Sequence, residues 1–272
     1  MTSTTFDVLA VIPARYASTR FPGKPLVEIA GKPMIQHVWE RIQLVSSVSK
    51  VIIATDDERI QTAALNFGAE VCMTSPEHPS GTDRLWEVSQ AYSNFDWILN
   101  VQGDEPFLEP EHLETVLQSR SILLNQKPDI ITVVTPFDSH ENWQNSNMVK
   151  AVLAPVQNQT SQDNKQPVYR ALYFSRAPIP YNRDGQTEYF PVAPQHAFRH
   201  LGLYLYRRSA LERFVSLPPS TLENLEKLEQ LRALEAGLSI FAVSVSHAPV
   251  GIDTPDDLLR LEDHALTKDL RQ

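Results

Sequence analysis

Short apolar runs alternate with segments of helical periodicity through the first half of the chain. Residues 6–12 are almost all apolar and stop at Pro13, as expected for a parallel strand that is buried on both faces. The segment 33–45 opens with Pro33 and repeats apolar residues at spacings of three and four, which predicts a helix. The same signals predict further strands at 51–54, 70–74, 97–101 and 130–135, and further helices at 58–67, 82–92 and 111–124.

This alternation predicts an α/β fold with a mostly parallel sheet and helices on both of its faces. The second half of the chain differs, because the apolar runs at 149–153, 168–175 and 198–206 have no long helical segments between them. We therefore expect an antiparallel extension of the sheet in this half. A last strand is expected at 239–245.

The segment 220–236 predicts one continuous helix. Ser220 and Glu223 form a capping box, and leucines follow at every third position. Strict spacings of three drift around a helix of 3.6 residues per turn, so the helix is apolar over a wide arc and is expected to be buried or shared with a partner chain. A final helix is expected after Thr254 as its N-cap. Two segments are expected to be irregular, a polar hairpin tip at 155–167 and a loop at 181–194.

Composition and charge narrow the classes of function. The 272 residues are 42% hydrophobic, and no apolar run approaches the roughly 20 residues of a membrane-spanning helix. No secretory signal is expected at the N-terminus, and the single cysteine, Cys72, excludes an internal disulfide framework and a cysteine-based zinc site. The net charge of −9 gives the chain no general attraction for nucleic acid or anionic membranes. These features agree with a cytoplasmic enzyme. The length permits one large domain or two small ones, and since no repeat or clear linker interrupts the sequence, a single domain over 1–272 is expected.

Three cations follow the first predicted strand within ten residues. Arg15, Arg20 and Lys24 alternate with small and hydroxyl residues, and parallel sheets bind ligands beyond the carboxyl ends of their strands. Arginine forks suit phosphate oxygens, and a lysine can neutralise a leaving pyrophosphate. The loop is not a Walker P-loop, because Ser18 stands where that motif needs glycine and Pro25 where it needs serine or threonine. Loop cations are also common on solvated surfaces, so the pattern alone permits both interpretations.

Acidic residues follow other predicted strands. Asp104 comes after a buried strand and a glycine, and Asp253 stands near the end of the last strand. Mg²⁺ is usually held by one or two carboxylates together with substrate phosphates, which makes both residues candidate ligands. Both also fit ordinary turn chemistry, and Asp253 before Thr-Pro fits a helix cap as well.

Hydroxyl residues and a glycine stand at the start of another predicted helix. The segment 78–84, HPSGTDR, places small side chains at a helix N-terminus, which suits the recognition of a base edge or a sugar. Helix capping alone explains the same pattern. Arg199 and His200 are a candidate binding pair, although a lone histidine is more often structural. No Ser–His–Asp order or Cys–His pairing points to covalent catalysis.

Ordered sequence blocks resemble one enzyme family. The stretch 12–26, IPARYASTRFPGKPL, closely resembles the opening of the 3-deoxy-D-manno-octulosonate (Kdo) cytidylyltransferases, also called CMP-Kdo synthetases. Seven further blocks match in order: ATDDERI, SGTDR, NVQGDEP, ALYFSRAPIP, RHLGLY, LEKLEQLRALE and GIDTPDDL. The resemblance spans nearly the whole chain, and a set of ordered blocks is far more specific than any one of them.

The resemblance implies a fold, a reaction and a set of site residues. The fold would be a three-layer α/β/α sandwich of the nucleotide-diphospho-sugar transferase type, usually a homodimer, with a nucleotide-binding half at about 1–135 and a sugar-binding and dimerisation part at about 136–250. The reaction would be the Mg²⁺-dependent conversion of CTP and Kdo to CMP-Kdo and pyrophosphate for lipopolysaccharide biosynthesis. The implied catalytic residues are Arg15, Lys24 and Asp104, and the implied Mg²⁺ ligands are Asp104 and Asp253. The implied nucleotide ligands are Ala14, Arg15, Ser18, Arg20, Lys24, Ser80, Gly81 and Thr82. The implied sugar ligands are Gln102, Arg176, His200, Tyr204, Glu229 and Gln230, with Arg176 facing the sugar carboxylate.

The mechanistic hypothesis is an in-line attack of the anomeric hydroxyl of Kdo on the α-phosphorus of CTP, assisted by the metal. A cytidylyltransferase for a related acidic sugar, such as 8-amino-Kdo or a nonulosonate, would share the nucleotide blocks. A non-catalytic nucleotide-sugar binding module is less consistent with the sequence, because binding alone does not need both metal carboxylates. The segment 155–167 is longer than the tight turn expected in the family.

Overall fold

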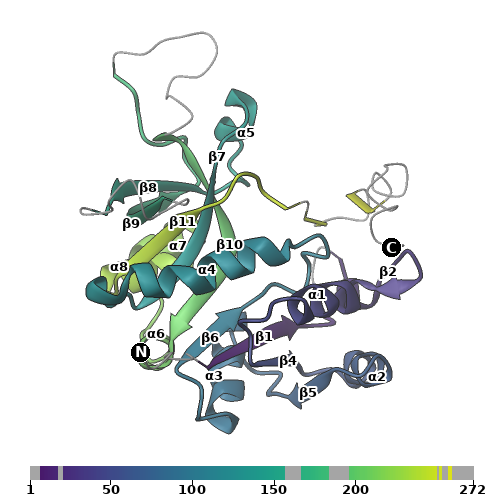
Figure 1. Ribbon diagram of the computed structural model, residues 1–272. Coiled ribbons are helices and arrows are strands. Elements are labelled where there is room, and N and C mark those ends of the chain that lie inside the picture. Colours follow the sequence, from purple (N-terminus) through teal and green to yellow (C-terminus); the bar gives the residue numbers. More distant parts are fainter. Residues whose placement is uncertain are drawn as a thin grey trace. The chain divides into compact units, whose positions relative to one another are not determined.

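The computed structural model describes residues 7–17, 21–156, 167–183, 196–249, 251–252 and 257–258 (Figure 1). The chain forms two compact units. The first comprises Met1–Leu113 and Pro249–Gln272, and the second comprises Glu114–Ala248. The 130–135 strand, which the sequence placed in the nucleotide-binding half, lies in the second unit.

Parallel strands form the centre of the first unit. β1 (Val8–Ala14) lies between β4 (Lys50–Thr55) and β6 (Trp97–Asn100), and β5 (Glu70–Met73) pairs with the far side of β4. Every residue of β1 except Pro13 is buried, which explains its continuous apolar run. Because these strands are parallel, the loops after β1, β4, β5 and β6 share one edge of the sheet.

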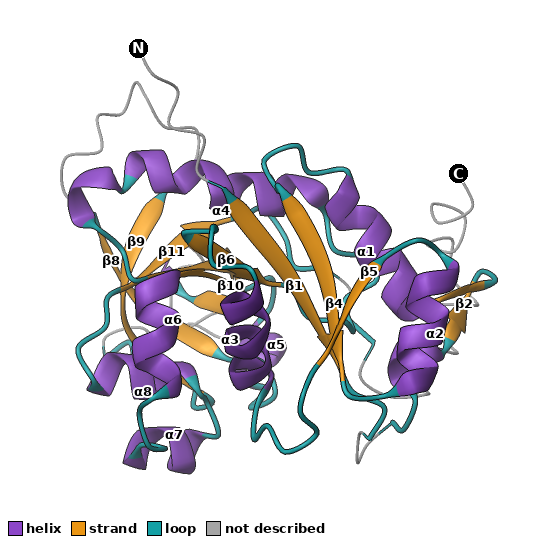
Figure 2. Cartoon of the chain, turned by 90° about the horizontal axis from the view of Figure 1, so that it is seen from below, coloured by secondary structure: helices purple, strands orange, loops and turns teal. Residues whose placement is uncertain are grey.

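Helices connect these strands. α1 (Met34–Gln43) follows a short hairpin of β2 (Glu28–Ile29) and β3 (Lys32–Pro33), which the sequence did not predict. α2 (Glu58–Asn66) connects β4 to β5, and α3 (Gly81–Ala91) connects β5 to β6. The chain reverses its direction across the sheet after β5, so right-handed crossovers put α3 on the face opposite α1. Figures 1 and 2 show this arrangement of the two helices about β1 and β4.

The second unit is built on a mixed sheet in the order β10-β7-β11-β9-β8. β11 runs parallel to β7, and the other pairings of these strands are antiparallel. The predicted antiparallel character of this half is therefore confirmed. The strands are β7 (Ile130–Pro136), β8 (Lys150–Pro155), β9 (Val168–Ser175), β10 (Phe198–Arg207) and β11 (Ile240–Ser244).

The helices of the second half differ most from the prediction. α4 (Pro110–Ile122) was expected, and the division between the two units falls within it. Two short helices, α5 (His140–Gln144) and α6 (Arg208–Val215), were not expected. The helix predicted over 220–236 is wrong, because this segment forms α7 (Thr221–Glu226) and α8 (Gln230–Glu235).

The break between α7 and α8 has a local cause. Lys227 ends α7 in the left-handed conformation, with φ 54° and ψ 46°. This turn leaves Leu225 on the surface, 75% exposed, and buries Leu228, 5% exposed. The leucines at every third position therefore serve two helices of different direction, and the predicted capping box of Ser220 and Glu223 is confirmed at the start of α7.

Several sequence predictions fall on residues outside the described ranges. They concern most of the 155–167 hairpin tip, most of the 181–194 loop and the cap of the final helix at Thr254. Among the helices that are described, none has the length and apolarity needed to cross a bilayer.

The left-handed residue between α7 and α8 generates a prediction about stability. Lys227→Gly is expected to raise the free energy of unfolding by about 0.5–1 kcal/mol, because glycine adopts this conformation without the steric penalty of a Cβ. Lys227→Ala removes the same charge but keeps the Cβ, so it should show no such gain. Urea denaturation of both variants checks this, and equal stabilities would contradict the steric explanation.

Candidate active site

An ion pair marks the carboxyl edge of the parallel strands in the first unit. Lys24 opens a short 3₁₀ helix in the loop after β1, and Asp104 lies in the loop after β6. The Lys24 Nζ and the Asp104 Oδ2 are 2.7 Å apart. The lysine side chain is only 10% exposed, whereas the aspartate side chain is 43% exposed. The sequence-predicted phosphate ligand and metal ligand are therefore direct neighbours, with the carboxylate on the more open side.

Two glycines permit this arrangement. A Cβ on Gly103 would lie 3.1 Å from the carbonyl oxygen of Pro13, so the absence of a side chain lets the loop after β6 lie against the end of β1. Gly23 has φ 73°, a left-handed conformation that favours glycine, and its N–H donates to the carbonyl of Tyr16 at 2.9 Å. The loop after β1 therefore folds back on itself just before Lys24.

Arg15 joins the cation loop to the start of α3. Its guanidinium donates hydrogen bonds to the carbonyl of His78 and, at 3.4 Å, to the carbonyl of Ser80. Ser80 is the N-cap of α3, and its hydroxyl accepts from the N–H groups of Thr82 and Asp83 at 3.1 and 3.3 Å. The structure thus brings the predicted phosphate loop and the predicted base-binding segment together within the first unit.

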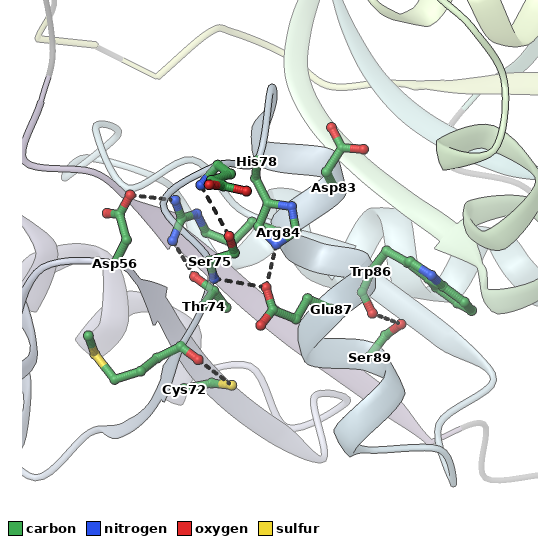
Figure 3. A network of polar contacts seen from close by, with 12 residues as sticks. Asp56, Cys72, Thr74, Ser75, His78, Asp83, Arg84, Trp86, Glu87 and Ser89 are labelled. Carbon is green, nitrogen blue, oxygen red and sulfur yellow. Dashed lines mark hydrogen bonds and ion pairs between the residues drawn. The ribbon is translucent and has the colours of Figure 1, made fainter.

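A polar network around the start of α3 was not assigned by sequence reasoning (Figure 3). Arg84, on the first turn of α3, is 0% exposed and donates to Asp56 at 3.0 Å and to the hydroxyl of Thr74. One turn later, Glu87 accepts hydrogen bonds from His78 and from the Ser75 N–H. The signal in the sequence was an arginine in the first turn of a helix, where the helix dipole disfavours a cation unless a specific partner compensates.

The pKa of Glu87 reflects these contacts. Partial burial acts to raise the pKa of its carboxyl group, but the hydrogen bonds from His78 and from the Ser75 N–H outweigh this effect. The pKa therefore lies below its ordinary value, and Glu87 stays charged as it holds the 75–78 segment against α3.

Other predicted residues of the first unit have simpler positions or lie outside the described ranges. Ala14 is the last, buried residue of β1, and Gln102 follows β6 directly before Gly103. Gly81 and Thr82 form the first turn of α3. Ser18, Arg20 and Asp253 lie outside the described residues, so their assignments stay predictions.

In the second unit, His200 and Tyr204 lie on β10, and their ring centroids are 5.3 Å apart. Residues four apart in a regular strand are separated by about 13 Å. The pairing of β10 with β7 shifts between Leu201 and Tyr204, and this irregularity brings the two rings together. Gly202, inside the strand, is the sequence signal that could have indicated it.

The hydrogen bonds of His200 define its tautomer. The Thr132 hydroxyl donates to the carbonyl of Leu203 at 2.7 Å, which uses its only proton. The His200 Nε2, 2.8 Å from that hydroxyl oxygen, must therefore carry a proton and donate it, which leaves Nδ1 as an acceptor. Burial lowers the pKa of His200 to about 3, so the ring is neutral at physiological pH.

Tyr204, Glu229 and Gln230 complete the predicted sugar residues on β10 and α8. Burial raises the pKa of Tyr204 well above its ordinary value, and the neighbouring Tyr206 and Glu229 act in the same direction. The phenol therefore keeps its proton and can donate it in a hydrogen bond. Gln230 opens α8 and is buried, and Glu229 directly precedes it.

Arg176 makes contacts that the sequence did not suggest. Its guanidinium donates to the carbonyls of Glu226 at 2.7 Å, Ser146 at 3.1 Å and Lys227 at 3.4 Å. The Glu226 carboxylate in turn accepts from the Arg176 N–H at 2.8 Å and from the Ser175 hydroxyl at 2.5 Å. Arg176 thus fastens the end of α7 to the end of β9, and its predicted role toward a sugar carboxylate stays a prediction.

The low pKa of His200 generates a prediction about pH dependence. An unfolded histidine has a pKa of about 6.5, so between pH 6.5 and 3 the unfolded state binds the extra proton. The stabilisation by the neutral ring is complete above pH 6.5 and is lost on acidification by up to about 1.4 kcal/mol per pH unit. His200→Gln should flatten the slope of unfolding free energy against pH, as measured by urea denaturation. Equal slopes in wild type and His200→Gln would contradict the burial effect.

Comparison with known proteins agrees with this geometry. A family model described as cytidylyltransferase matches residues 9–240. A 3-deoxy-manno-octulosonate cytidylyltransferase from Syntrophotalea carbinolica is 46% identical over 262 residues, which cover 95% of this chain and 98% of that protein. A protein of the same name from Cytophaga hutchinsonii is 43% identical over 260 residues, with 95% and 98% of the two chains covered.

A solved structure supports the same relationship. A CMP:2-keto-3-deoxy-manno-octonic acid synthetase complexed with CTP aligns with a TM-score of 0.82 and 39% identity, over 97% of this chain and 99% of that chain. The predicted α/β fold with a mostly parallel, mixed sheet is therefore confirmed. The chain belongs to the cytidylyltransferase family, and within it to the 3-deoxy-manno-octulosonate cytidylyltransferases.

Proposed function

We propose that this protein transfers the cytidylyl group of CTP to Kdo, releasing pyrophosphate and giving CMP-Kdo for lipopolysaccharide biosynthesis. Its relatives carry the name of this activity, and the related solved structure holds CTP. The observation in the molecule that carries the proposal is the Lys24–Asp104 ion pair at the carboxyl edge of β1 and β6. Phosphoryl-transfer sites need a cation for the phosphates beside a carboxylate for a metal.

Nucleotide binding is assigned to residues of the first unit. Arg15 and Lys24 contact the phosphates, and Lys24 does so by exchanging its ion pair with Asp104 for a phosphate oxygen. The base is recognised at the first turn of α3, where Gly81 and the small side chains of Ser80 and Thr82 favour close approach. The nucleotide ligands are Ala14, Arg15, Ser18, Arg20, Lys24, Ser80, Gly81 and Thr82.

The residues present fit a Mg²⁺ ion. Asp104 offers a hard oxygen ligand that is 43% exposed, and one or two carboxylates with substrate phosphates are the usual magnesium ligands in such sites. Asp253 is proposed as the second carboxylate. A bound Mg²⁺ would neutralise phosphate charge and lower the pKa of a nearby hydroxyl.

The reaction exchanges one phosphorus–oxygen bond for another. The anomeric oxygen of Kdo forms a bond to the α-phosphorus, the bond from this phosphorus to the β-phosphate oxygen breaks, and the hydroxyl proton passes to solvent. Arg15 and Lys24 stabilise the charge that develops on the leaving pyrophosphate. With a pKa of about 3, His200 is a weak general base, so its role is to orient the sugar through its Nδ1 acceptor.

The sugar and the assembly are proposed as follows. Kdo is contacted by Gln102, Arg176, His200, Tyr204, Glu229 and Gln230. Backbone carbonyls use three of the five N–H donors of the Arg176 guanidinium, so it can donate to the sugar carboxylate as well. We propose a cytoplasmic homodimer with no nucleic acid or membrane partner. Leu172 on β9 and Leu225 on α7 are 52% and 75% exposed, and contact with a second copy would remove such apolar surface from water.

Pyrophosphate release tests the proposed function. We expect turnover with CTP and Kdo, and far less with UTP or ATP as the nucleotide. Preferred turnover of 8-amino-Kdo or N-acetylneuraminate would reassign the sugar, and no turnover of any pair would support a binding module instead.

Asp104→Asn is expected to lower kcat by about 100-fold or more while leaving the fold intact, because it removes the charged metal ligand. Pyrophosphate release at saturating CTP, Kdo and Mg²⁺ measures this, with circular dichroism as the check on folding. Asp57→Asn is the matched control. Asp57 follows β4, which lies on the other side of β1 from β6, and it caps α2, a role that asparagine also fills. Near-normal turnover of Asp104→Asn would refute the metal role.

A further inference from the structure

Arg84 is the most deeply buried cation of the first unit among the residues that the structure describes. It lies on the first turn of α3 with no exposed surface. Its guanidinium bridges Asp56, directly after β4, and Thr74, directly after β5 (Figure 3). Thr74 in turn donates from its backbone N–H to the Thr55 carbonyl at 2.9 Å. One side chain therefore ties the start of a helix to the carboxyl ends of two strands.

The physical chemistry of this contact favours a positioning role over a stabilising one. Removing an ion pair from water carries a desolvation penalty that often cancels the Coulomb attraction, so apolar residues of similar size would stabilise the fold as well. The Arg84 Nε is also buried without a hydrogen-bond partner among the described residues. The Arg84–Asp56 pair instead fixes the orientation of the groups it joins, because a planar guanidinium can bind its acceptors in only a few arrangements.

The first turn of α3 is held from two sides. Arg84 holds it against the strand ends, and Arg15 holds the carbonyls of His78 and Ser80 just before it. Glu87 fixes the same preceding segment through His78 and the Ser75 N–H. The position of the Ser80–Thr82 turn relative to the cation loop therefore depends on Arg84 and Glu87, which are not among the proposed ligands, as well as on Arg15, a proposed phosphate ligand.

We propose that Arg84 is a positioning residue that sets the discrimination between cytosine and uracil by fixing the first turn of α3. This inference rests on the proposed function, in which that turn recognises the base. Cytosine and uracil differ in their donor and acceptor pattern at positions 3 and 4, and reading that pattern requires protein groups held to within about 0.5 Å. A shift of the turn affects the matched base most, because only cytosine uses those hydrogen bonds.

The test compares two nucleotides in one variant. Arg84→Lys keeps the charge but loses the fork, and we expect kcat/KM for CTP to fall between about 10- and 100-fold, mainly through KM. The kcat/KM for UTP should fall much less, so the ratio of kcat/KM for CTP to kcat/KM for UTP should decrease. KM for Kdo should stay unchanged. A merely structural role would lower kcat/KM for CTP and kcat/KM for UTP by the same factor. Arg84→Met, with Asp56→Asn to remove the unpaired carboxylate, is a second variant with the same expected change in ratio.

Glu70→Gln is the matched control. It breaks the 2.6 Å ion pair of Glu70 with Lys50, which joins β4 and β5 at their opposite, amino ends, and it should leave the CTP/UTP ratio at the wild-type value. Folded Arg84 variants with an unchanged ratio, or with equal losses for both nucleotides, would overturn the inference. Failure of the wild-type protein to release pyrophosphate from CTP and Kdo would instead refute the proposed function. In that case, calorimetric binding of CTP and UTP to the same variants decides the role of Arg84.

Discussion

The ion pair between Lys24 and Asp104 is the contact on which the candidate active site depends. It joins the loop after β1 to the loop after β6, and both loops reach the same edge because β1 and β6 are adjacent parallel strands. The missing side chain at Gly103 lets them approach each other. A cation that suits phosphate and a carboxylate that suits a metal here neutralise each other. In the free protein, this contact gives the largely buried Lys24 ammonium a partner. Binding of a nucleotide and a metal would give Lys24 and Asp104 new partners and break the pair.

Other contacts orient polar groups within each unit. In the first unit, Arg15 and Arg84 both fix the start of α3. In the second unit, the irregular pairing of β10 brings His200 and Tyr204 together, and burial fixes the protonation of both. Both rings are uncharged, so they recognise a hydrogen-bond partner by direction rather than by charge.

Much of the fold could be predicted from the sequence, because the spacing of apolar residues indicates the strands and helices, and the positions of charged residues after the strands indicate the site. The buried strands of the first unit are continuous apolar runs, and the loops at their carboxyl ends contain Lys24 and Asp104, where the architecture predicts a site. Several features did not follow, and three of them show why. The break at Lys227 places a lysine in the left-handed conformation and accompanies the burial of Leu228, which the leucine spacing alone does not predict. Likewise, the partners of Arg84 and the hydrogen bonds of Arg176 come from segments distant in sequence.

Binding of CTP without metal tests the exchange of the Lys24–Asp104 pair most directly. Calorimetry in the presence of a chelator would compare wild type with Asp104→Asn, Lys24→Met and the double variant. If Asp104 competes with phosphate for Lys24, Asp104→Asn binds CTP more tightly than wild type, Lys24→Met binds it more weakly, and the gain from Asp104→Asn shrinks when Lys24 is already replaced. Unchanged or weaker binding by Asp104→Asn would contradict the exchange and leave the ion pair as a structural contact.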